Sequence, residues 1–292
     1  MNMTTKTQTQ VTPCPYCSCV NHKEWAEELG FSVVRCEGCD LLFISPIPSQ
    51  ESVDQAVRSG IYKTLDLNVT AKRIPRKIEK YRKIFRILFA DVWKDSFPIT
   101  WVDVGCGYGE VLEAVSTLVP AGSLICGYEP MTVKAEKAIS MGLHVTNEYL
   151  TPHSIEADVI SAVDIFSHIP DFHSFLSIVA TNLRVNGLLY LETGNLADLN
   201  RRIDFPGELG VPDHLVFAGE KHLRGYLDRA GFDIESVDYV RIDGFLELCK
   251  NIVKRLLGRP FSLQVPYTSK YRQVLIRARL RNDPNRPSAI VL

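Results

Sequence analysis

Short apolar runs alternate with segments of helical period from Ile99 to the end of the chain. Runs that are almost continuously apolar predict strands buried on both faces, as in a parallel sheet. The strand candidates are Ile99–Val104, Ser123–Tyr128, Leu143–Thr146, Ala157–Val163, Leu188–Glu192, Phe232–Ile242 and Gln273–Leu280. The helix candidates are Tyr108–Leu118, Thr132–Met141, Phe172–Arg184 and Gly219–Ala230. This alternation predicts an α/β fold with helices on both faces of a mostly parallel sheet, and a late antiparallel strand would fit its end.

Residues 48–95, ahead of the alternating region, carry an apolar and basic stripe of helical period. The stripe runs through Ile74, Ile78, Tyr81, Ile84, Phe85 and Leu88. Phe97 and Pro98 mark its end. We therefore predict a helical segment that connects to the sheet or covers it as a lid.

Five of the eight cysteines fall within residues 14–39, and four of them form two Cys-x-x-Cys pairs. The pairs are Cys14 with Cys17 and Cys36 with Cys39. Four thiolates at this spacing can close a tetrahedron on one Zn²⁺ ion, because each turn presents two sulfurs to the metal. A closed four-thiolate shell leaves no open position, so the predicted zinc is structural rather than catalytic. We interpret Cys19 as a bystander.

Charge and hydropathy limit the partners of the chain. Lys and Arg number 33 against 34 Asp and Glu, so the net charge is −1 and there is no global basic field for nucleic acid. No apolar run approaches the roughly 20 residues that span a bilayer. The polar N-terminal residues contain no apolar core of a signal peptide, so we expect a cytoplasmic protein with reduced cysteines.

A glycine-rich loop follows the first strand candidate and leads into a helix candidate. It reads Asp103-Val-Gly105-Cys-Gly107-Tyr-Gly109-Glu110. Glycines permit positive φ and let a ligand approach the backbone closely. The G-x-x-x-x-G-K-[ST] pattern of a P-loop is absent. A dinucleotide fingerprint would place Glu110 at its third glycine, where a carboxylate repels a diphosphate.

S-adenosylmethionine (SAM) suits this loop better than a phosphorylated ligand does. SAM carries an ammonium, a sulfonium and a ribose diol, but no phosphate. Asp103, just before the loop, suits the cationic end of SAM. Glu129 closes the next strand candidate, where its carboxylate can accept hydrogen bonds from both ribose hydroxyls. A glycine turn in some other doubly wound fold is the alternative.

Five motifs, the glycine loop among them, resemble those of class I SAM-dependent methyltransferases, and the similarity runs through most of the chain. They are VDVGCGYGEVL, GYEP, ADVISAVDIFSHIPD, NGLLYLETGN and DHLVFAGEKHLRGYLDRAGFDI. In addition, CPYC and CEGCDLLFISPIPSQE resemble the N-terminal zinc ribbon of a subset of these enzymes. That subset includes sugar C-methyltransferases and enzymes of glycan and natural-product pathways. The resemblance implies a seven-stranded Rossmann-like sheet and SAM as the cofactor.

The resemblance also divides the chain and names its SAM-binding residues. We expect a disordered arm (1–12), a zinc ribbon (13–47), a helical connector or lid (48–95) and a SAM-binding methyltransferase domain (96–292). The residues predicted to bind SAM are Asp103, Gly105, Cys106, Gly107, Gly109, Glu129, Pro130 and Asp164.

Two positions depart from the resemblance. Ser167 stands where an acidic residue usually precedes the histidine that follows the fourth strand. Val211 stands where sugar C-methyltransferases carry a tyrosine, three residues before a histidine. These departures weaken the resemblance to C-methylating enzymes, and we expect oxygen as the acceptor atom.

A hydroxyl acceptor needs a base, and histidine is the usual base near neutral pH. His168 follows the fourth strand candidate, at the carboxyl edge where such folds bind ligands. His214 lies in a Pro-Asp-His loop before a helix candidate. We predict that one of the two is the catalytic base, His214 before His168, with a structural role on a loop as the alternative. Asp164 and Glu192, at strand ends, are predicted to line the site.

The predicted function is methyl transfer to a sugar, glycan end or natural-product scaffold. A second hypothesis is an RNA methyltransferase that uses the ribbon as an RNA clamp. In the ribbon Lys23 and Arg35 face five acidic residues, which opposes phosphate binding, whereas the basic tail at 272–286 favours it. A third is a non-catalytic scaffold that binds zinc and SAM, against which the intact glycine loop argues.

An amphipathic segment, Phe245–Leu257, places Lys250, Lys254 and Arg255 beside an apolar stripe. We interpret it as a helix packed on its own domain. The pattern is also compatible with part of a substrate lid, or with peripheral contact to a lipid or lipid-linked substrate.

Overall fold

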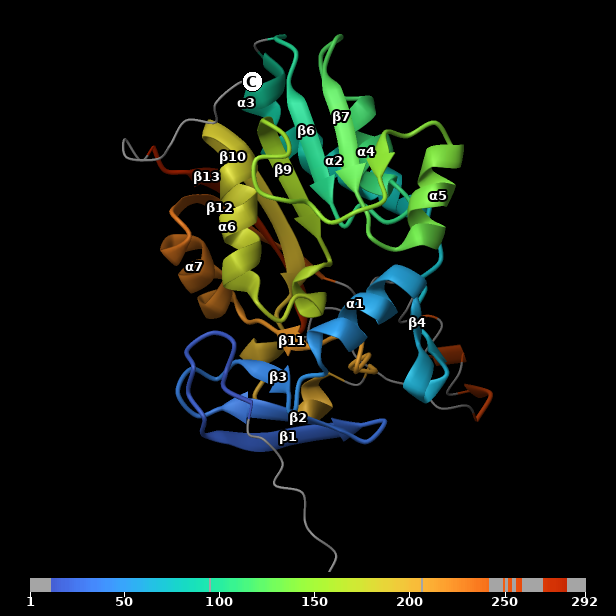
Figure 1. Cartoon of the computed structure of the whole chain (residues 1–292), viewed down its shortest axis with the longest axis vertical. Coiled ribbons are helices and arrows are strands. Elements are labelled where there is room, and N and C mark those ends of the chain that lie inside the picture. Colours follow the sequence, from blue (N-terminus) through green and yellow to red (C-terminus); the bar gives the residue numbers. More distant parts are fainter. Residues whose placement is uncertain are drawn as a thin grey trace, which may run out of the picture.

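Two sheets, one large and one small, organise the computed structural model of this chain (Figure 1). The structure describes residues 12–94, 96–205, 207–241, 249, 252–253, 256–258 and 270–282. All but the last residue of the predicted arm 1–12, and most of the segment Phe245–Leu257, lie outside the described residues.

The large sheet has seven strands, and all seven strand candidates fall in it. Its order is β12-β13-β10-β9-β6-β7-β8. The bounds are β6 (Thr100–Val104), β7 (Leu124–Tyr128), β8 (Val145–Thr146), β9 (Ala157–Val163), β10 (Leu183–Gly194), β12 (Phe232–Arg241) and β13 (Arg272–Leu280). The pairs from β10 to β8 are parallel, whereas β13 runs antiparallel to both β10 and β12. The predicted α/β class and the late antiparallel strand are therefore confirmed.

Side chains alternate along the central strands and feed two apolar cores, one on each face of the sheet. Trp101, Val159 and Tyr190 join the core beneath α2 (Arg76–Leu88) and α4 (Glu110–Ser116). The neighbouring residues Val102, Ile160 and Leu191 join the core beneath α6 (Phe172–Asn182) and α7 (Glu220–Arg229). The described residues of this domain also form α3 (Ala90–Lys94) and α5 (Thr132–Ser140).

The small sheet contains the N-terminal cysteine region and one strand from far along the chain. Its order is β1 (His22–Glu28), β2 (Phe31–Cys36), β3 (Leu42–Ile44) and β11 (Val216–Phe217), all antiparallel. Ribbon side chains such as Phe43 share one apolar core with the face of the large sheet that carries α6 and α7. The ribbon therefore shares both a sheet and a core with the larger domain, and Figure 1 shows the small sheet below the large one, with its strands running across the direction of the large sheet's strands.

The segment 48–95 is less helical than its pattern predicts. Helix α1 (Gln50–Ser59) ends at Gly60, which adopts a left-handed conformation with φ +72° and donates its N–H to the Ala56 carbonyl. A short hairpin follows, made of β4 (Ile61–Tyr62), the 3₁₀ turn η1 (Lys63–Leu65) and β5 (Leu67–Asn68). Helix α2 begins only at Arg76, so no α-helix covers residues 60–75 of the predicted helical connector.

The strand order places a ligand crevice at the carboxyl edge of β6. The chain moves from β6 outward to β7 and β8, and then crosses back to β9 on the other side of β6. Loops after β6 and β9 therefore diverge, which opens a crevice between them at the switch point of the sheet.

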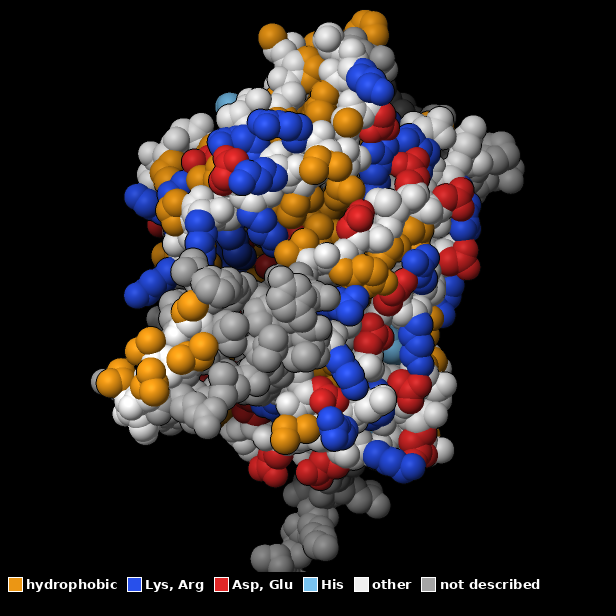
Figure 2. All heavy atoms as spheres, turned by 180° about the vertical axis from the view of Figure 1, so that it is seen from behind, with side chains coloured by type: hydrophobic (Ala, Val, Ile, Leu, Met, Phe, Trp, Pro, Cys, Tyr) orange, Lys and Arg blue, Asp and Glu red, His pale blue; other side chains and the backbone are white. Residues whose placement is uncertain are grey.

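The surface carries charges of both signs. On the face shown in Figure 2, basic and acidic side chains are interspersed among apolar ones. Among the residues that the structure describes, no helix combines the length and the apolar character needed to cross a membrane.

A buried polar network lies within the core beneath α2 and ties the strands beside the switch point together. Trp101 Nε1 donates to Ser161 Oγ at 2.9 Å, and Ser161 Oγ donates to Asp103 Oδ1 at 2.5 Å. Burial raises the pKa of Asp103 to about 8 against the effect of the Ser161 hydrogen bond, and Glu129 and Glu110 add to the rise. Asp103 therefore holds a proton in the folded protein at neutral pH.

We predict that Asp103→Asn flattens the dependence of folding stability on pH. Because the folded pKa exceeds the unfolded one, the stabilising contribution of Asp103 is complete below about pH 4 and falls as pH rises towards about 8. An asparagine carries no such titration. Urea unfolding between pH 4.5 and 8 measures the slope, with the exposed Asp66→Asn as the control. An equal slope in wild type and Asp103→Asn would contradict the assignment.

Candidate functional site

The glycine loop connects β6 to α4 through three glycines with positive φ. Gly105, Gly107 and Gly109 have φ of +67°, +56° and +86°. A Cβ on Gly105 would lie 2.5 Å from Ile165 Cγ2, and one on Gly109 would lie 2.1 Å from Leu143 Cδ1. A Cβ on Gly107 would meet nothing within 4 Å. The loop backbone is thus packed tightly behind Gly105 and Gly109 and faces open space at Gly107.

Glu129 follows the carboxyl end of β7 and holds this loop in place. Its Oε2 accepts the Gly107 N–H at 2.7 Å, and its Oε1 accepts the Met131 N–H at 2.8 Å. Only 5% of the residue is exposed. A carboxylate has about four acceptor positions, so two backbone donors leave each oxygen able to accept one more hydrogen bond.

One cavity of about 850 Å³ lies at the carboxyl edge of the sheet and collects most of the predicted site residues. Its lining includes Gly105, Gly107, Glu129, Pro130, Asp164, His168 and His214. Asp103, Cys106 and Gly109 do not line it. Asp103 is buried in the network beneath α2, and Cys106 packs against Gly127, where a Cβ would lie 2.5 Å from its sulfur. In this structure these three residues shape the loop from behind.

Asp164 has positive φ (+56°) and stands where β9 ends. Lys77 Nζ of α2 lies 3.4 Å from Asp164 Oδ2, and Gln273 Nε2 donates to its Oδ1 at 3.1 Å. Glu192, also predicted to line the site, does not line the cavity and has no exposed side-chain surface. The position of Glu192 on β10 turns its carboxylate to the face of the sheet that α2 covers. There Lys80 Nζ of α2 lies 2.5 Å from Glu192 Oε1.

His168 and His214 lie 46 residues apart in sequence and come together in the fold. His168 ends the 3₁₀ turn η2 (Phe166–His168), and the two ring centroids lie 4.9 Å apart at an interplanar angle of 68°. His168 Nδ1 is 2.9 Å from the Asp213 carbonyl oxygen, and His214 Nδ1 is 2.7 Å from the Leu209 carbonyl oxygen. A carbonyl can only accept, so both Nδ1 atoms carry the hydrogen, and each neutral ring keeps its lone pair on Nε2.

Asp213 separates the protonation behaviour of the two rings. Burial alone would lower the pKa of His168, but the hydrogen bond and charge of Asp213 outweigh burial and raise it. Burial, helped by the neighbouring His168, holds the pKa of His214 below its ordinary value. His214 is therefore neutral at pH 7, the form that a base requires.

Sequence reasoning did not identify Asp213 or Lys77 as residues of this site. Asp213 precedes His214 directly, so its adjacency was a usable indication. Lys77 lies 87 residues before Asp164, and only the packing of α2 against the sheet brings the two together.

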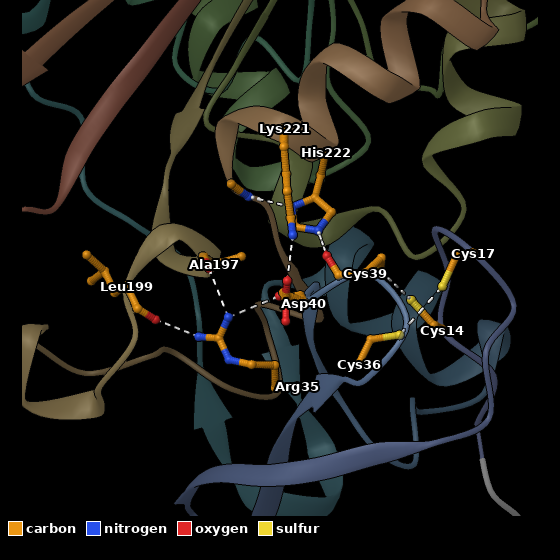
Figure 3. A network of polar contacts seen from close by, with 11 residues as sticks. Cys14, Cys17, Arg35, Cys36, Cys39, Asp40, Ala197, Leu199, Lys221 and His222 are labelled. Carbon is orange, nitrogen blue, oxygen red and sulfur yellow. Dashed lines mark hydrogen bonds and ion pairs between the residues drawn. The ribbon is translucent and has the colours of Figure 1, made fainter.

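The four paired cysteines meet at one point in the ribbon. Cys14 Sγ lies 3.5 Å from Cys39 Sγ, and Cys17 Sγ lies 3.5 Å from Cys36 Sγ. All four sulfurs fall within 4.8 Å of one another, and Figure 3 shows them directed at a common centre. Cys19 Sγ instead contacts the Asn21 carbonyl oxygen at 3.6 Å.

Ribbon and larger domain make polar contacts beside the cysteines (Figure 3). Arg35 Nη1 donates to the Ala197 carbonyl at 3.0 Å and Nη2 to the Leu199 carbonyl at 2.5 Å. The buried His222 of α7 contacts the carbonyl oxygen of Cys39 through Nε2 at 2.8 Å. The second Cys-x-x-Cys turn is therefore fixed to α7 by its backbone.

Comparison with known proteins finds curated relatives for part of the chain. Ubiquinone biosynthesis O-methyltransferase of Salmonella paratyphi A is 27% identical over 101 residues, which cover 32% of this chain and 42% of that protein. The chain thus spans less than half the length of this curated relative.

Solved structures resemble the chain over a larger part of its length. Magnesium protoporphyrin IX methyltransferase of Synechocystis PCC 6803, with bound S-adenosylhomocysteine (SAH), covers 70% of this chain and 83% of its own at 15% identity and a TM-score of 0.46. Geranyl diphosphate C-methyltransferase of Streptomyces coelicolor A3(2) covers 70% and 83% at 13% identity and a TM-score of 0.48.

A family model described as a methyltransferase domain matches residues 72–237, from just before α2 into β12. The matched residues include the glycine loop, Glu129, Asp164 and both histidines. Because they make up more than half of the chain, the chain belongs to this methyltransferase-domain family.

Proposed function

We propose that this protein transfers a methyl group from SAM to a hydroxyl oxygen of a small-molecule acceptor. The observation that carries the proposal is one cavity of about 850 Å³, which the glycine loop, Glu129 and the two histidines all line. Ligand cavities in proteins usually measure 300–1,000 Å³. Cofactor and acceptor can therefore occupy the same cavity, as direct transfer requires.

Gly107 and Glu129 fit the chemistry of SAM. The backbone at Gly107 faces open space, so a ligand can approach it closely. Glu129 keeps acceptor capacity on both oxygens, which suits a ribose diol. Bound SAM would supply an electrophilic methyl group on a sulfonium, and Asp164 is the candidate partner for its charged end.

His214 is the proposed general base. Its ring is neutral at pH 7, its Nδ1–H is engaged by Leu209, and its Nε2 is the atom left to accept a proton from an acceptor hydroxyl. His168, whose pKa is raised, is the proposed second polar group of the acceptor site. Asp213 raises the pKa of His168 because both the carbonyl oxygen and the carboxylate of Asp213 lie beside His168 Nδ1.

The rest of the lining supports an acceptor with an apolar body, such as a natural-product scaffold or a sugar attached to one. The cavity wall includes the rings of Phe175, Phe205, Phe217 and Tyr271. Oxygen as the acceptor atom suits the O-methyltransferase named among the relatives.

The ribbon does not favour RNA as the acceptor. Within residues 12–47 the only cations are Lys23 and Arg35. Arg35 donates hydrogen bonds to the Ala197 and Leu199 carbonyls, and Lys23 Nζ lies 2.8 Å from Glu37 Oε1. The ribbon thus has no unpaired cation for phosphate, which RNA binding would require.

We further propose that Cys14, Cys17, Cys36 and Cys39 hold one structural Zn²⁺ ion. Four sulfurs around a common centre match the four-thiolate shell that zinc accepts. Free thiols that bind metal persist in reducing compartments, which supports a cytoplasmic location.

Binding of SAH tests the cofactor assignment. We expect Glu129→Gln to weaken SAH binding by about 10- to 100-fold, because an amide presents one acceptor oxygen where the carboxylate presents two. Titration calorimetry on the zinc-loaded protein measures the affinity, and Glu136→Gln, exposed on α5, is the matched control. Undiminished affinity in Glu129→Gln would refute the ribose contact, and no binding to wild type would refute the proposed function.

Transfer of a labelled methyl group from SAM to a panel of phenols, sugars and glycosides tests the base. We expect His214→Gln to lower kcat about 10²- to 10⁴-fold with unchanged SAH affinity, and the exposed His144→Gln to have no effect. In wild type, kcat should fall as acid protonates His214, with the midpoint below the ordinary histidine pKa because burial and His168 lower it. Asp213 and Asp164 oppose that shift. Unchanged turnover in His214→Gln would remove this residue as the base.

Zinc content tests the ribbon. We expect one zinc per chain in wild type and in Cys19→Ser, and none in Cys36→Ser, which should also unfold at a lower temperature because metal binding contributes folding free energy. Elemental analysis and thermal unfolding measure both quantities. Equal zinc loss in the two variants would contradict the four-cysteine assignment.

A further inference from the structure

The loop that carries His214 also carries the carbonyl that orients its ring. It leaves Leu209, turns at Gly210 with φ +76°, and closes with a hydrogen bond from the His214 N–H to the Gly210 carbonyl at 3.0 Å. Leu209 supplies the carbonyl that accepts the Nδ1–H of His214. The position of the Leu209 peptide therefore determines which nitrogen of His214 keeps its lone pair.

Glu28 of the ribbon binds the backbone of this same turn. Its Oε2 accepts the Leu209 N–H and its Oε1 accepts the Gly210 N–H, each at 2.8 Å. The Glu28 side chain is 17% exposed and ends β1, just before the tip of the hairpin with β2. Both carboxylate oxygens thus bind consecutive backbone donors that lie 181 and 182 residues further along the chain.

Other hydrogen bonds hold the rest of the loop, but among the described residues only Glu28 accepts the Leu209 N–H, while the Leu209 side chain is buried in the apolar core. Tyr62 of β4 donates its hydroxyl hydrogen to the Pro212 carbonyl at 2.8 Å. Ile44 of β3 donates its N–H to the Leu215 carbonyl at 2.9 Å, and Leu215 donates to the Ser167 carbonyl at 2.7 Å. Arg202 approaches Glu28 itself, with Nη2 at 3.7 Å from Oε2.

We propose that Glu28 is a positioning residue for methyl transfer: by fixing the Leu209–Gly210 turn, it keeps His214 in the Nδ1–H form with Nε2 available as the base. The proposal rests on the function proposed above, and it assigns part of the acceptor site to the ribbon. Glu28 does not line the cavity and acts only through His214.

A carboxylate is the side chain that this turn requires. Two consecutive N–H groups need two acceptors, which glutamate provides and glutamine does not. Hydrogen bonds from backbone N–H groups to a charged acceptor are also stronger than neutral ones. With one acceptor lost, the Leu209 peptide can rotate and its carbonyl can leave the His214 ring.

The tautomer of His214 gives a readout that needs neither SAM nor the acceptor. Full-length, zinc-loaded protein labelled with ¹⁵N-histidine is measured at pH 7.5 by two-bond ¹H–¹⁵N correlation, and the His214 signals are assigned by their loss in His214→Gln. We expect wild type to show the Nδ1–H form. We expect Glu28→Gln to lose most of it to the Nε2–H form, and Glu28→Ala to lose more.

Glu27→Gln is the matched control, since Glu27 neighbours Glu28 on β1 and is exposed. It should keep the wild-type tautomer. Zinc content and SAH affinity should be unchanged in Glu28→Gln, which separates loss of positioning from unfolding of the ribbon. A wild-type tautomer in Glu28→Gln and Glu28→Ala would overturn the proposal, as would an Nε2–H form in wild type. A protein that transfers no methyl group but shows the tautomer switch would refute the proposed function while leaving the action of Glu28 on His214 intact.

Discussion

The antiparallel pairing of β3 with β11 joins the ribbon to the larger domain, and the geometry of the cavity depends on it. It is short, with Val216 opposite Phe43 and Phe217 opposite Leu42. Because β11 begins two residues after His214, the pairing fixes the end of the loop 209–215, the histidine loop, against the ribbon. The other end of that loop is held by Glu28. One side of the cavity is therefore held by a module whose own stability is proposed to come from a metal ion.

The sequence predicted the large sheet well because its strands are buried on both faces. Such strands are continuous apolar runs, so β9 was located at its observed bounds and β6 and β7 within one residue at one end. The glycine loop and the cysteine pairs could also be predicted from the sequence, since each places several residues of one type at a fixed spacing. These features depend on local chemistry alone.

Other features depend on pairings between distant segments, which the local pattern of apolar and polar residues does not indicate. Strand β11 is two residues long, and nothing in Val216–Phe217 marks it as part of a ribbon formed near the N-terminus. Within residues 48–95, the apolar and basic stripe from Ile74 to Leu88 coincides with α2, whereas Gly60 and the hairpin after it lie ahead of the stripe. Glu192 ends a predicted strand, yet alternation along β10 turns its carboxylate away from the cavity and towards Lys80.

The sharing of one sheet between ribbon and larger domain has a consequence for modularity. A module joined only by a linker can be cut off or exchanged, and the remainder keeps its fold. Here, removal of residues 13–47 would leave β11 as an exposed edge with unpaired backbone groups and would uncover the apolar surface around Val216 and Phe217. Residues 72–237, which match the family model, thus pair through β11 with a strand outside that match. A ribbon transplanted from a relative would have to supply a strand that pairs with β11 and an acceptor for the Leu209 and Gly210 N–H groups.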